Sequence, residues 1–183
     1  MLPFLIAACA LFSTTALGHI DVGVCPDIVD KYDFDPVPYL GRWYEAQRFH
    51  IVYEIGQDCV NTIYDDLGDG YIGVHNMGRS TSGNLTDISG KAHLIAPGVL
   101  SVEFLGYPAG DYHVLGTDYE NFSCVYDCGQ DGPLRTQHAW LLTRAKIPDE
   151  ATFEIANEVF ARNGIDVSLF HRTHQGDDCP YVV

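Results

Sequence analysis

The sequence predicts an all-β fold: an eight-stranded up-and-down antiparallel β-barrel with one C-terminal α-helix packed outside it. Short segments rich in β-branched and aromatic residues follow one another from residue 42, and clusters of glycine, proline, asparagine and aspartate separate them. One later segment instead repeats its apolar residues at helical spacing. Eight strands joined by short turns close into a barrel that has no free edges and leaves room for a ligand inside.

The eight candidate strands alternate with strong turn signals. The strands are Arg42 to Val52, Val60 to Asp65, Tyr71 to Met77, Leu85 to Ile95, Val99 to Leu105, Asp111 to Thr117, Phe122 to Cys128 and Thr136 to Ala145. The breaks between them include Gly68-Asp69-Gly70, Ser82-Gly83-Asn84 and Ala96-Pro97-Gly98. Ahead of the first strand, Asp27 to Pro38 is predicted to be irregular.

A helix is predicted from Asp149 to Asn163. The apolar residues that recur at helical spacing in it are Ile155, Ala156, Val159 and Phe160. Asp149 and Glu150 fall in the first turn, where negative charge suits the helix dipole, and Gly164 follows as a C-terminal stop. A short final strand, Val167 to His171, is predicted after the helix.

The first eighteen residues predict a secretory signal peptide. Met1 to Gly18 contains no charged side chain and includes the apolar run Leu2 to Leu11, which is too short to cross a bilayer. The small residues Ala16 and Gly18 end it at the spacing that a signal peptidase reads. We therefore expect one secreted domain, residues 19–183, with a single hydrophobic core.

The chain is acidic, with a formal net charge of −15 at pH 7. Nucleic-acid binding needs lysine and arginine to displace counterions, so this balance argues against a nucleic-acid partner. The same charge disfavours anionic membrane surfaces. No stretch after the signal peptide is long and apolar enough to span a bilayer, so we expect a soluble extracellular protein without membrane insertion.

The cysteines refine the expected compartment. Once Cys9 leaves with the signal peptide, the remaining ones are Cys25, Cys59, Cys124, Cys128 and Cys179. In a secreted chain they predict a disulfide framework with one thiol left over. A zinc site is the competing interpretation of Cys124 and Cys128, but no second pair at ligand spacing follows. Two sequons, at Asn84 and Asn121, fit the secretory route as glycosylation sites.

Three motifs occur in a specific order. Gly41-Arg42-Trp43-Tyr44-Glu45 opens the first strand, Thr117-Asp118-Tyr119 falls in the turn between the sixth and seventh, and Arg144 ends the eighth. Together they resemble the signature of the lipocalin family, over essentially the whole mature chain. The resemblance implies that the tryptophan plugs the closed end of the barrel and that the arginine lies across its indole as a cation–π pair. Six residues are accordingly assigned to fold stability: Gly41, Trp43, Thr117, Asp118, Tyr119 and Arg144.

Within that family the chain is similar to the apolipoprotein D, bilin-binding and crustacyanin group, on the segments Tyr119 to Cys128 and Gln175 to Pro180. The resemblance implies the disulfides Cys25–Cys128 and Cys59–Cys179. It leaves Cys124 as a free thiol, because the helix position that pairs with it in crustacyanin-type members is Ala156 here. Strand alternation places Cys124 outward, beneath the helix, as a buried hydrophobe. A reactive or intermolecular thiol is the alternative.

The predicted ligand site is the barrel interior. If Trp43 points inward, strand parity also turns in Glu45, Gln47 and Phe49, and the parity of the eighth strand turns in His138, Trp140 and Leu142. The residues predicted to line the cavity with polar or aromatic groups are Glu45, Gln47, Tyr64, Asn76, Phe104, Tyr112, His138 and Trp140. Such a lining suits a small apolar molecule with a few polar groups. The alternative is that the same side chains simply fill the barrel.

We therefore expect a carrier of a small hydrophobic ligand (a carotenoid, bilin, fatty acid or steroid), with no required cofactor and no catalytic residue. One alternative is a secreted lipocalin that binds proteins through its loops. Another is an enzyme, but Cys124 falls on the outward face and no nucleophile–base–acid arrangement stands out. His138 is the best inward candidate among the histidines, and one histidine does not make a metal site. The protein is expected to be a monomer or a homodimer.

Overall fold

The computed structural model describes residues 18–51 and 54–181, and the predicted signal peptide lies outside this part apart from Gly18. In chain order the elements are β1 (His19–Val22), α1 (Pro36–Tyr39), β2 (Gly41–Arg48), β3 (Asp58–Gly68), β4 (Tyr71–Arg79), β5 (Leu85–Ala96), β6 (Val99–Phe104), β7 (Gly110–Thr117), β8 (Phe122–Asp131), β9 (Leu134–Thr143), α2 (Glu150–Arg162), the 3-10 helix η2 (Val167–Leu169) and β10 (His171–Arg172).

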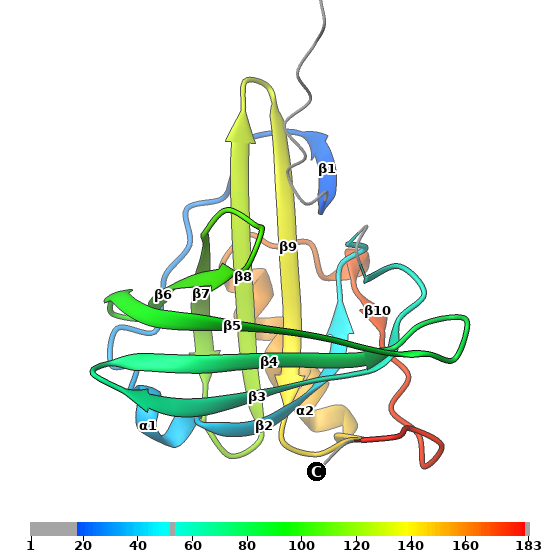
Figure 1. Cartoon of the computed structure of the whole chain (residues 1–183). Coiled ribbons are helices and arrows are strands. Elements are labelled where there is room, and N and C mark those ends of the chain that lie inside the picture. Colours follow the sequence, from blue (N-terminus) through cyan, green and yellow to red (C-terminus); the bar gives the residue numbers. More distant parts are fainter. Residues whose placement is uncertain (1–17, 52–53, 182–183) are drawn as a thin grey trace, which may run out of the picture.

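Strands β2 to β9 form a closed antiparallel barrel of eight strands, which confirms the predicted fold class (Figure 1). Each strand pairs with the next one along the chain, and Tyr44 of β2 pairs with Thr143 of β9 to close the ring. In Figure 1, β3, β4 and β5 run across the front, while β8 and β9 rise behind them and project beyond the barrel. Strongly tilted and coiled strands of this kind are typical of small barrels.

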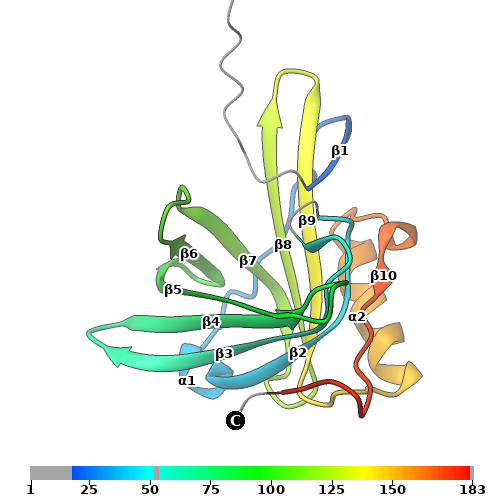
Figure 2. The same ribbon diagram turned by 45° about the vertical axis from the view of Figure 1, so that its right-hand side comes forward.

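Helix α2 packs against the outer face of β7 and β8, as expected (Figure 2). The Asp149 carboxylate caps its first turn by accepting the backbone N–H of Thr152 at 2.9 Å. Gly116 of β7 lies beneath Val159. A Cβ at that glycine would come within 3.2 Å of a Val159 methyl, so glycine permits the close approach. Among the described helices, none is both long and apolar enough to cross a bilayer.

The space between α2 and the barrel is a second hydrophobic core, separate from the barrel interior. Cys124 is fully buried there, with its Sγ 3.7 Å from the carbonyl oxygen of Ala156. It is the free cysteine of the described chain, in the outward and covered position that strand alternation predicts. Burial raises the pKa of this thiol, so it stays protonated and shielded from solvent.

The structure contains both disulfides that the resemblance implies. Cys25 is bonded to Cys128 of β8, and Cys59 of β3 is bonded to Cys179 in the C-terminal tail. They join residues 103 and 120 positions apart in the sequence, so each one closes a long loop of the unfolded chain. The N-terminal arm and the C-terminal tail are thereby fixed to opposite parts of the barrel wall.

Several predicted boundaries are wrong. The predicted final strand, Val167 to His171, is instead η2 followed by the two-residue β10, because the Asp166 carboxylate caps a turn by accepting the Ser168 N–H at 2.9 Å. The first barrel strand ends at Arg48 rather than Val52, although Ile51 is buried within the following loop. The apolar residue Ile51 therefore reflects burial of the loop and not strand pairing. The arm predicted to be irregular contains α1, and β1 adds a strand beside β9.

A thiol count tests this covalent framework. For the chain that begins at His19, we expect no thiol to react with Ellman's reagent in the native state and one to react in denaturant without reductant, because Cys124 is buried and the other four cysteines are bonded. Reduction in denaturant should raise the count to five. A native thiol that reacts at once, or a peptide map that links Cys124 to another cysteine, would contradict the assignment.

Candidate ligand-binding site

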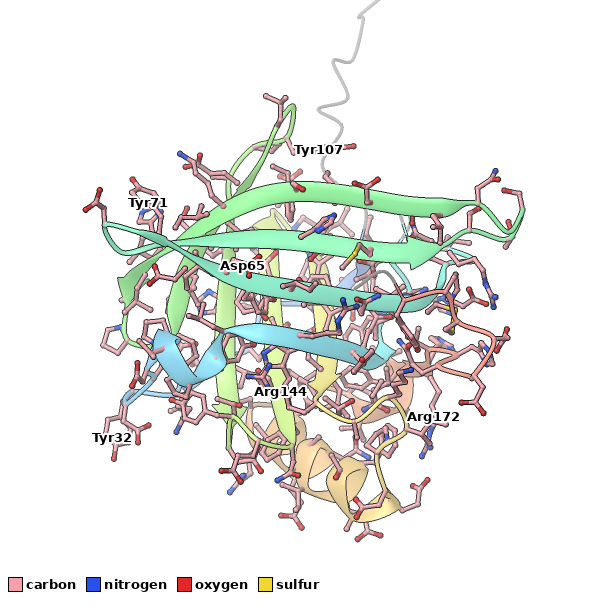
Figure 3. The ribbon with its side chains drawn as sticks, turned by 60° about the horizontal axis from the view of Figure 1, so that its bottom comes forward. Tyr32, Asp65, Tyr71, Tyr107, Arg144 and Arg172 are labelled. Carbon is pink, nitrogen blue, oxygen red and sulfur yellow. A yellow bond between two sulfur atoms is a disulfide. The ribbon has the colours of Figure 1, made fainter. Side chains whose placement is uncertain are left out.

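Trp43 and Arg144 close one end of the barrel. Trp43 is fully buried, and its indole N–H donates to the carbonyl of Tyr39 at 2.8 Å. The guanidinium carbon of Arg144 lies 3.8 Å from the centre of the Trp43 ring, which is cation–π distance. Figure 3 shows Arg144 beside β2 in the middle of this end. Its N–H groups donate to four backbone carbonyls, those of Pro38, Leu40, Arg42 and Tyr119.

The other motif residues hold the backbone around this stack. Gly41 has a φ of 91°, a conformation in which an L side chain is strained, so the glycine of the first motif has a backbone role. The Asp118 carboxylate accepts the backbone N–H groups of the three residues after Tyr119: Glu120, Asn121 and Phe122. This turn presents the Tyr119 carbonyl to Arg144 at 3.0 Å. The motifs therefore act on structure, as the resemblance implies.

Four hydroxyl groups form a chain across the barrel interior next to Trp43. Ser123 lies 2.7 Å from the Tyr39 hydroxyl, Tyr39 lies 2.8 Å from that of Tyr112, and Tyr112 lies 2.9 Å from that of Tyr64. Burial raises the pKa of all three phenols, so they remain neutral hydrogen-bonding groups at physiological pH. This half of the interior is a packed core and not an open space.

Toward the opposite end, side chains on the inner wall become accessible. Ile88 pairs with Asn76 and lies on the same face of β5 as buried Ala92, yet 37% of its surface is exposed. Trp43 and Val114, also on the inner wall, are not exposed at all. A side chain that points into the barrel and is still reached by solvent requires open space around it. The interior is therefore sealed at the Trp43 end, while solvent reaches part of its wall toward the other end.

Seven of the eight predicted lining residues lie on the inner wall: Glu45, Tyr64, Asn76, Phe104, Tyr112, His138 and Trp140. Their contact with a ligand stays a prediction. The prediction that Gln47 lines the interior is wrong, because its amide donates to Asn157 of α2 at 3.3 Å on the outside of the barrel. The pairing of β2 with β9 shifts between Glu45 and Gln47, and this β-bulge reverses the parity that follows. Phe49, predicted inward, packs in the core under α2 for the same reason.

The reversed parity brings Arg48 to the inner wall, where sequence reasoning did not place it. We call Glu45, Arg48, Glu54 and Trp140 the mouth cluster. Arg48 forms a close ion pair with Glu45 and lies 3.4 Å from the Glu54 carboxylate. The same carboxylate accepts the Trp140 indole N–H at 3.3 Å. Arg48 also donates to the backbone carbonyls of Glu54 and Gln57, which ties the loop after β2 to the barrel.

Glu54 had no recognisable signal in the sequence, because it lies in a loop whose path depends on the bulge. Burial, and then repulsion by Glu45, raise the pKa of Glu54 to about 8, although Arg48 and the Trp140 N–H favour the anion. A carboxyl group in this part of the barrel is therefore held in its neutral form near physiological pH.

His138 lies beside the mouth cluster. Its ring is stacked on that of Trp140, with centroids 5.8 Å apart and 7° between the planes. The Nδ1 atom is 3.2 Å from the Asp127 carboxylate, while Nε2 is buried and has no hydrogen-bond partner. Gly18 covers this side of the ring, since a Cβ there would lie 2.7 Å from Nε2. Cleavage after Gly18 would uncover that nitrogen.

The outer surface has two pockets, one group of potential metal ligands and two sequons. Pockets of about 200 and 240 Å³ lie outside the barrel, one beside the Cys59–Cys179 disulfide and one between the C-terminal segment and α2. His174, Asp178 and Cys179 are close enough together for a metal ion, but the Cys179 sulfur is already bonded to Cys59. Asn84 and Asn121 are both exposed in turns, and their glycosylation stays a prediction.

Replacing Trp43 by alanine is expected to lower the free energy of unfolding by about 3–5 kcal/mol, because it leaves a cavity in the packed end and deprives Arg144 of its ring. Urea unfolding followed by circular dichroism measures this. The matched control is Tyr71→Ala on the outer face, where the ring is 39% exposed and the loss should be much smaller. A loss below about 1 kcal/mol for Trp43→Ala would mean that the plug has been misassigned.

Glu54→Gln is expected to change how stability depends on pH. The folded pKa of about 8 lies above the ordinary value of 4.5, so the folded wild type holds a proton that the unfolded chain releases between these values. The stability that Glu54 contributes is thus fully present below pH 4.5 and is lost as pH rises through 8. Unfolding free energies measured across this window should decline for the wild type relative to the variant, and a constant difference would contradict the assignment. The control is the exposed Glu150→Gln.

Comparisons with known proteins agree with this geometry. Residues 34–175 match the family model described as a lipocalin-like domain. Apolipoprotein D of Mus musculus is 32% identical over 98% of this chain and 97% of its own length, and the Lazarillo protein of Schistocerca americana is 30% identical over 92% and 82%.

Among solved structures, lobster apocrustacyanin A1 superposes with a TM-score of 0.80 at 23% identity, covering 88% of this chain and 94% of that one. Insecticyanin from the tobacco hornworm Manduca sexta has a TM-score of 0.73 at 24% identity, covering 90% and 92%. These two likenesses concern the fold, while the family follows from the domain match and the sequence relatives. The barrel and its plugged end are those of a chain that belongs to the lipocalin family.

Proposed function

We propose that the protein is a secreted carrier that holds a small hydrophobic molecule in the hollow half of its barrel. The observation that carries the proposal is the accessibility of Ile88, a side chain on the inner wall with 37% of its surface exposed. An apolar wall kept open to solvent is unfavourable unless something else covers it. An apolar ligand gains about 25 cal/mol per Å² of its own buried surface, before its lost freedom of motion is subtracted.

The wall around this space combines apolar surface with a few polar groups, as ligand sites do. Ile88, Val102 and Phe104 supply apolar area, while Asn76 and His138 offer hydrogen-bonding atoms. The structural relatives include apocrustacyanin A1 and insecticyanin, and the sequence relatives include apolipoprotein D. A carotenoid, bilin, fatty acid or steroid therefore remains the class of ligand to test, and no cofactor is required to bind it.

A carrier accounts for this wall better than an enzyme does. The free thiol of Cys124 lies in the core under α2, on the far side of the barrel wall from the hollow, and burial raises its pKa. A thiol in that position cannot act as a nucleophile on a ligand in the barrel. Secretion is supported by the predicted signal peptide, by two disulfides that need an oxidising compartment, and by the exposed sequons.

The test is uptake of the neutral dye Nile red by the wild type and by two variants of neighbouring residues on β5. Ile88→Trp places an indole into the hollow and should weaken binding about tenfold or more, which is ~1.4 kcal/mol. Ser89→Trp adds the same indole on the exposed outer face and should leave uptake unchanged. Binding is followed by the increase in dye emission. A wild type that takes up no dye, or two variants that behave alike, would refute the proposal.

Native mass spectrometry and an absorption spectrum of protein purified from its source then identify the ligand. A visible band with a matching bound mass assigns a carotenoid or bilin, and a colourless bound lipid assigns a fatty acid or steroid. An empty barrel that also ignores Nile red would favour the alternative in which the protein acts through its loops.

A further inference from the structure

We propose that the barrel accepts uncharged ligands and rejects their carboxylate counterparts, and that Glu45 sets this selectivity by occupying Arg48. The inference rests on the proposed carrier function and narrows its ligand class to molecules with hydroxyl, carbonyl or ester groups. It follows from three properties of the inner wall: the cations available there, the carboxyl groups already there, and the polar atoms that lack a partner.

Cations are scarce on the inner wall. The chain has ten lysines and arginines, all within the described residues. Eight of them do not lie on the inner wall, because they either point outward by strand alternation or lie outside the barrel strands. Arg144 is beneath Trp43, which separates it from the hollow. Arg48 alone reaches the open half, where it faces Trp140 across the β2–β9 pair.

Arg48 has no N–H group left for a ligand. Its Nη1 donates to the Glu45 carboxylate and, at 3.0 Å, to the Thr173 hydroxyl. Its Nη2 donates to the carbonyls of Glu54 and Gln57 at 2.7 and 3.0 Å, and its Nε faces the Glu54 carboxylate at 3.4 Å. A guanidinium carries five N–H bonds: four of them donate to these oxygens, and the fifth, on Nε, lies within ion-pair distance of the Glu54 carboxylate. A ligand carboxylate would have to displace a protein partner to reach this charge.

Carboxyl groups already outnumber the positive charge. Glu45, Glu54 and Asp127 face the same region as the single Arg48, and His138 is paired with Asp127. Burial, and then Glu45, raise the pKa of Glu54 to about 8, so the protein's own carboxyl group is disfavoured as an anion here. A carboxylate on a ligand would meet the same desolvation and the same repulsion.

The inner wall instead offers neutral hydrogen-bonding atoms. In the described part of the chain, two buried side-chain polar atoms have no hydrogen-bond partner, Thr62 Oγ1 and His138 Nε2. Both lie on inner-wall positions, since Thr62 pairs with Trp43 and His138 pairs with Asp127. Unsatisfied buried polar atoms are rare in folded proteins, and His138 Nε2 is one that cleavage after Gly18 would uncover. A hydroxyl group satisfies either atom without bringing a charge, and a carbonyl group accepts from the Thr62 hydroxyl.

The experiment compares retinol, retinoic acid and methyl retinoate, which share a polyene and differ in the head group. Binding is measured by quenching of tryptophan fluorescence at pH 7.5. For the wild type we expect retinol and the methyl ester to bind at least about tenfold more tightly than retinoic acid. Because the ester and the acid differ only in charge and one methyl group, this comparison needs no variant and tests the proposal even if a substitution fails to fold.

Glu45→Gln should release Arg48 from its counter-ion with little change of shape. We expect the ratio of retinoic acid affinity to retinol affinity to rise about tenfold in the variant relative to the wild type. Glu150→Gln, which removes the exposed partner of Arg172, is the matched control and should change neither affinity.

The outcomes separate the two proposals. If none of the three compounds binds the wild type, the carrier function itself fails. If all bind and the acid is as tight as the ester, the carrier function stands and the selectivity is refuted. A folded Glu45→Gln protein that keeps the wild-type ratio of acid to alcohol affinity would refute the role of Glu45.

Discussion

The stack of Arg144 on Trp43 is the interaction on which the rest of this barrel depends. The Arg144 guanidinium stacks on the Trp43 indole. Its N–H groups donate to carbonyls of residues 38–42 and of the turn after β7. These segments are far apart in the sequence, so a single side chain holds them together at the closed end. Because that end is packed and satisfied, the opposite half of the interior is free of a structural role and can stay hollow.

The β-bulge at Ala46 divides the barrel wall between two tasks. Before it, Glu45 points inward; after it, Arg48 points inward while Gln47 and Phe49 join the core under α2. An unbroken strand would send Arg48 outward and leave Glu45 buried without its counter-ion, which is strongly unfavourable. The bulge is therefore what makes a buried glutamate tolerable at this position. The C-terminal tail supports it, since the Gln175 amide donates to the Glu45 carbonyl at 2.9 Å.

Most of the fold could be predicted from the sequence because it depends on local signals. Turn residues separate the strands, helical spacing marks α2, and the motifs identify the closed end without knowledge of any contact. The candidate site was predicted less completely. Strand parity places Trp140 on the inner wall, and the resemblance places Tyr64 and Asn76 there. Parity is counted along the chain, however, and one extra residue at Ala46 reverses every later assignment on that strand. Arg48 and Glu54 were missed for this reason, and nothing in the local sequence marks the bulge.

The polar atoms of the inner wall differ between its two ends, and this difference separates a binding site from a packed core. A filled barrel would bury its polar atoms against one another, as the chain from Ser123 to Tyr64 does at the packed end. Toward the open half, by contrast, His138 Nε2 has no partner while solvent reaches Ile88. Arg48 is saturated in the same region, so its charge is directed at the protein and not at the hollow. Because the charged groups of the interior are paired with one another, this wall favours an uncharged ligand over a carboxylate.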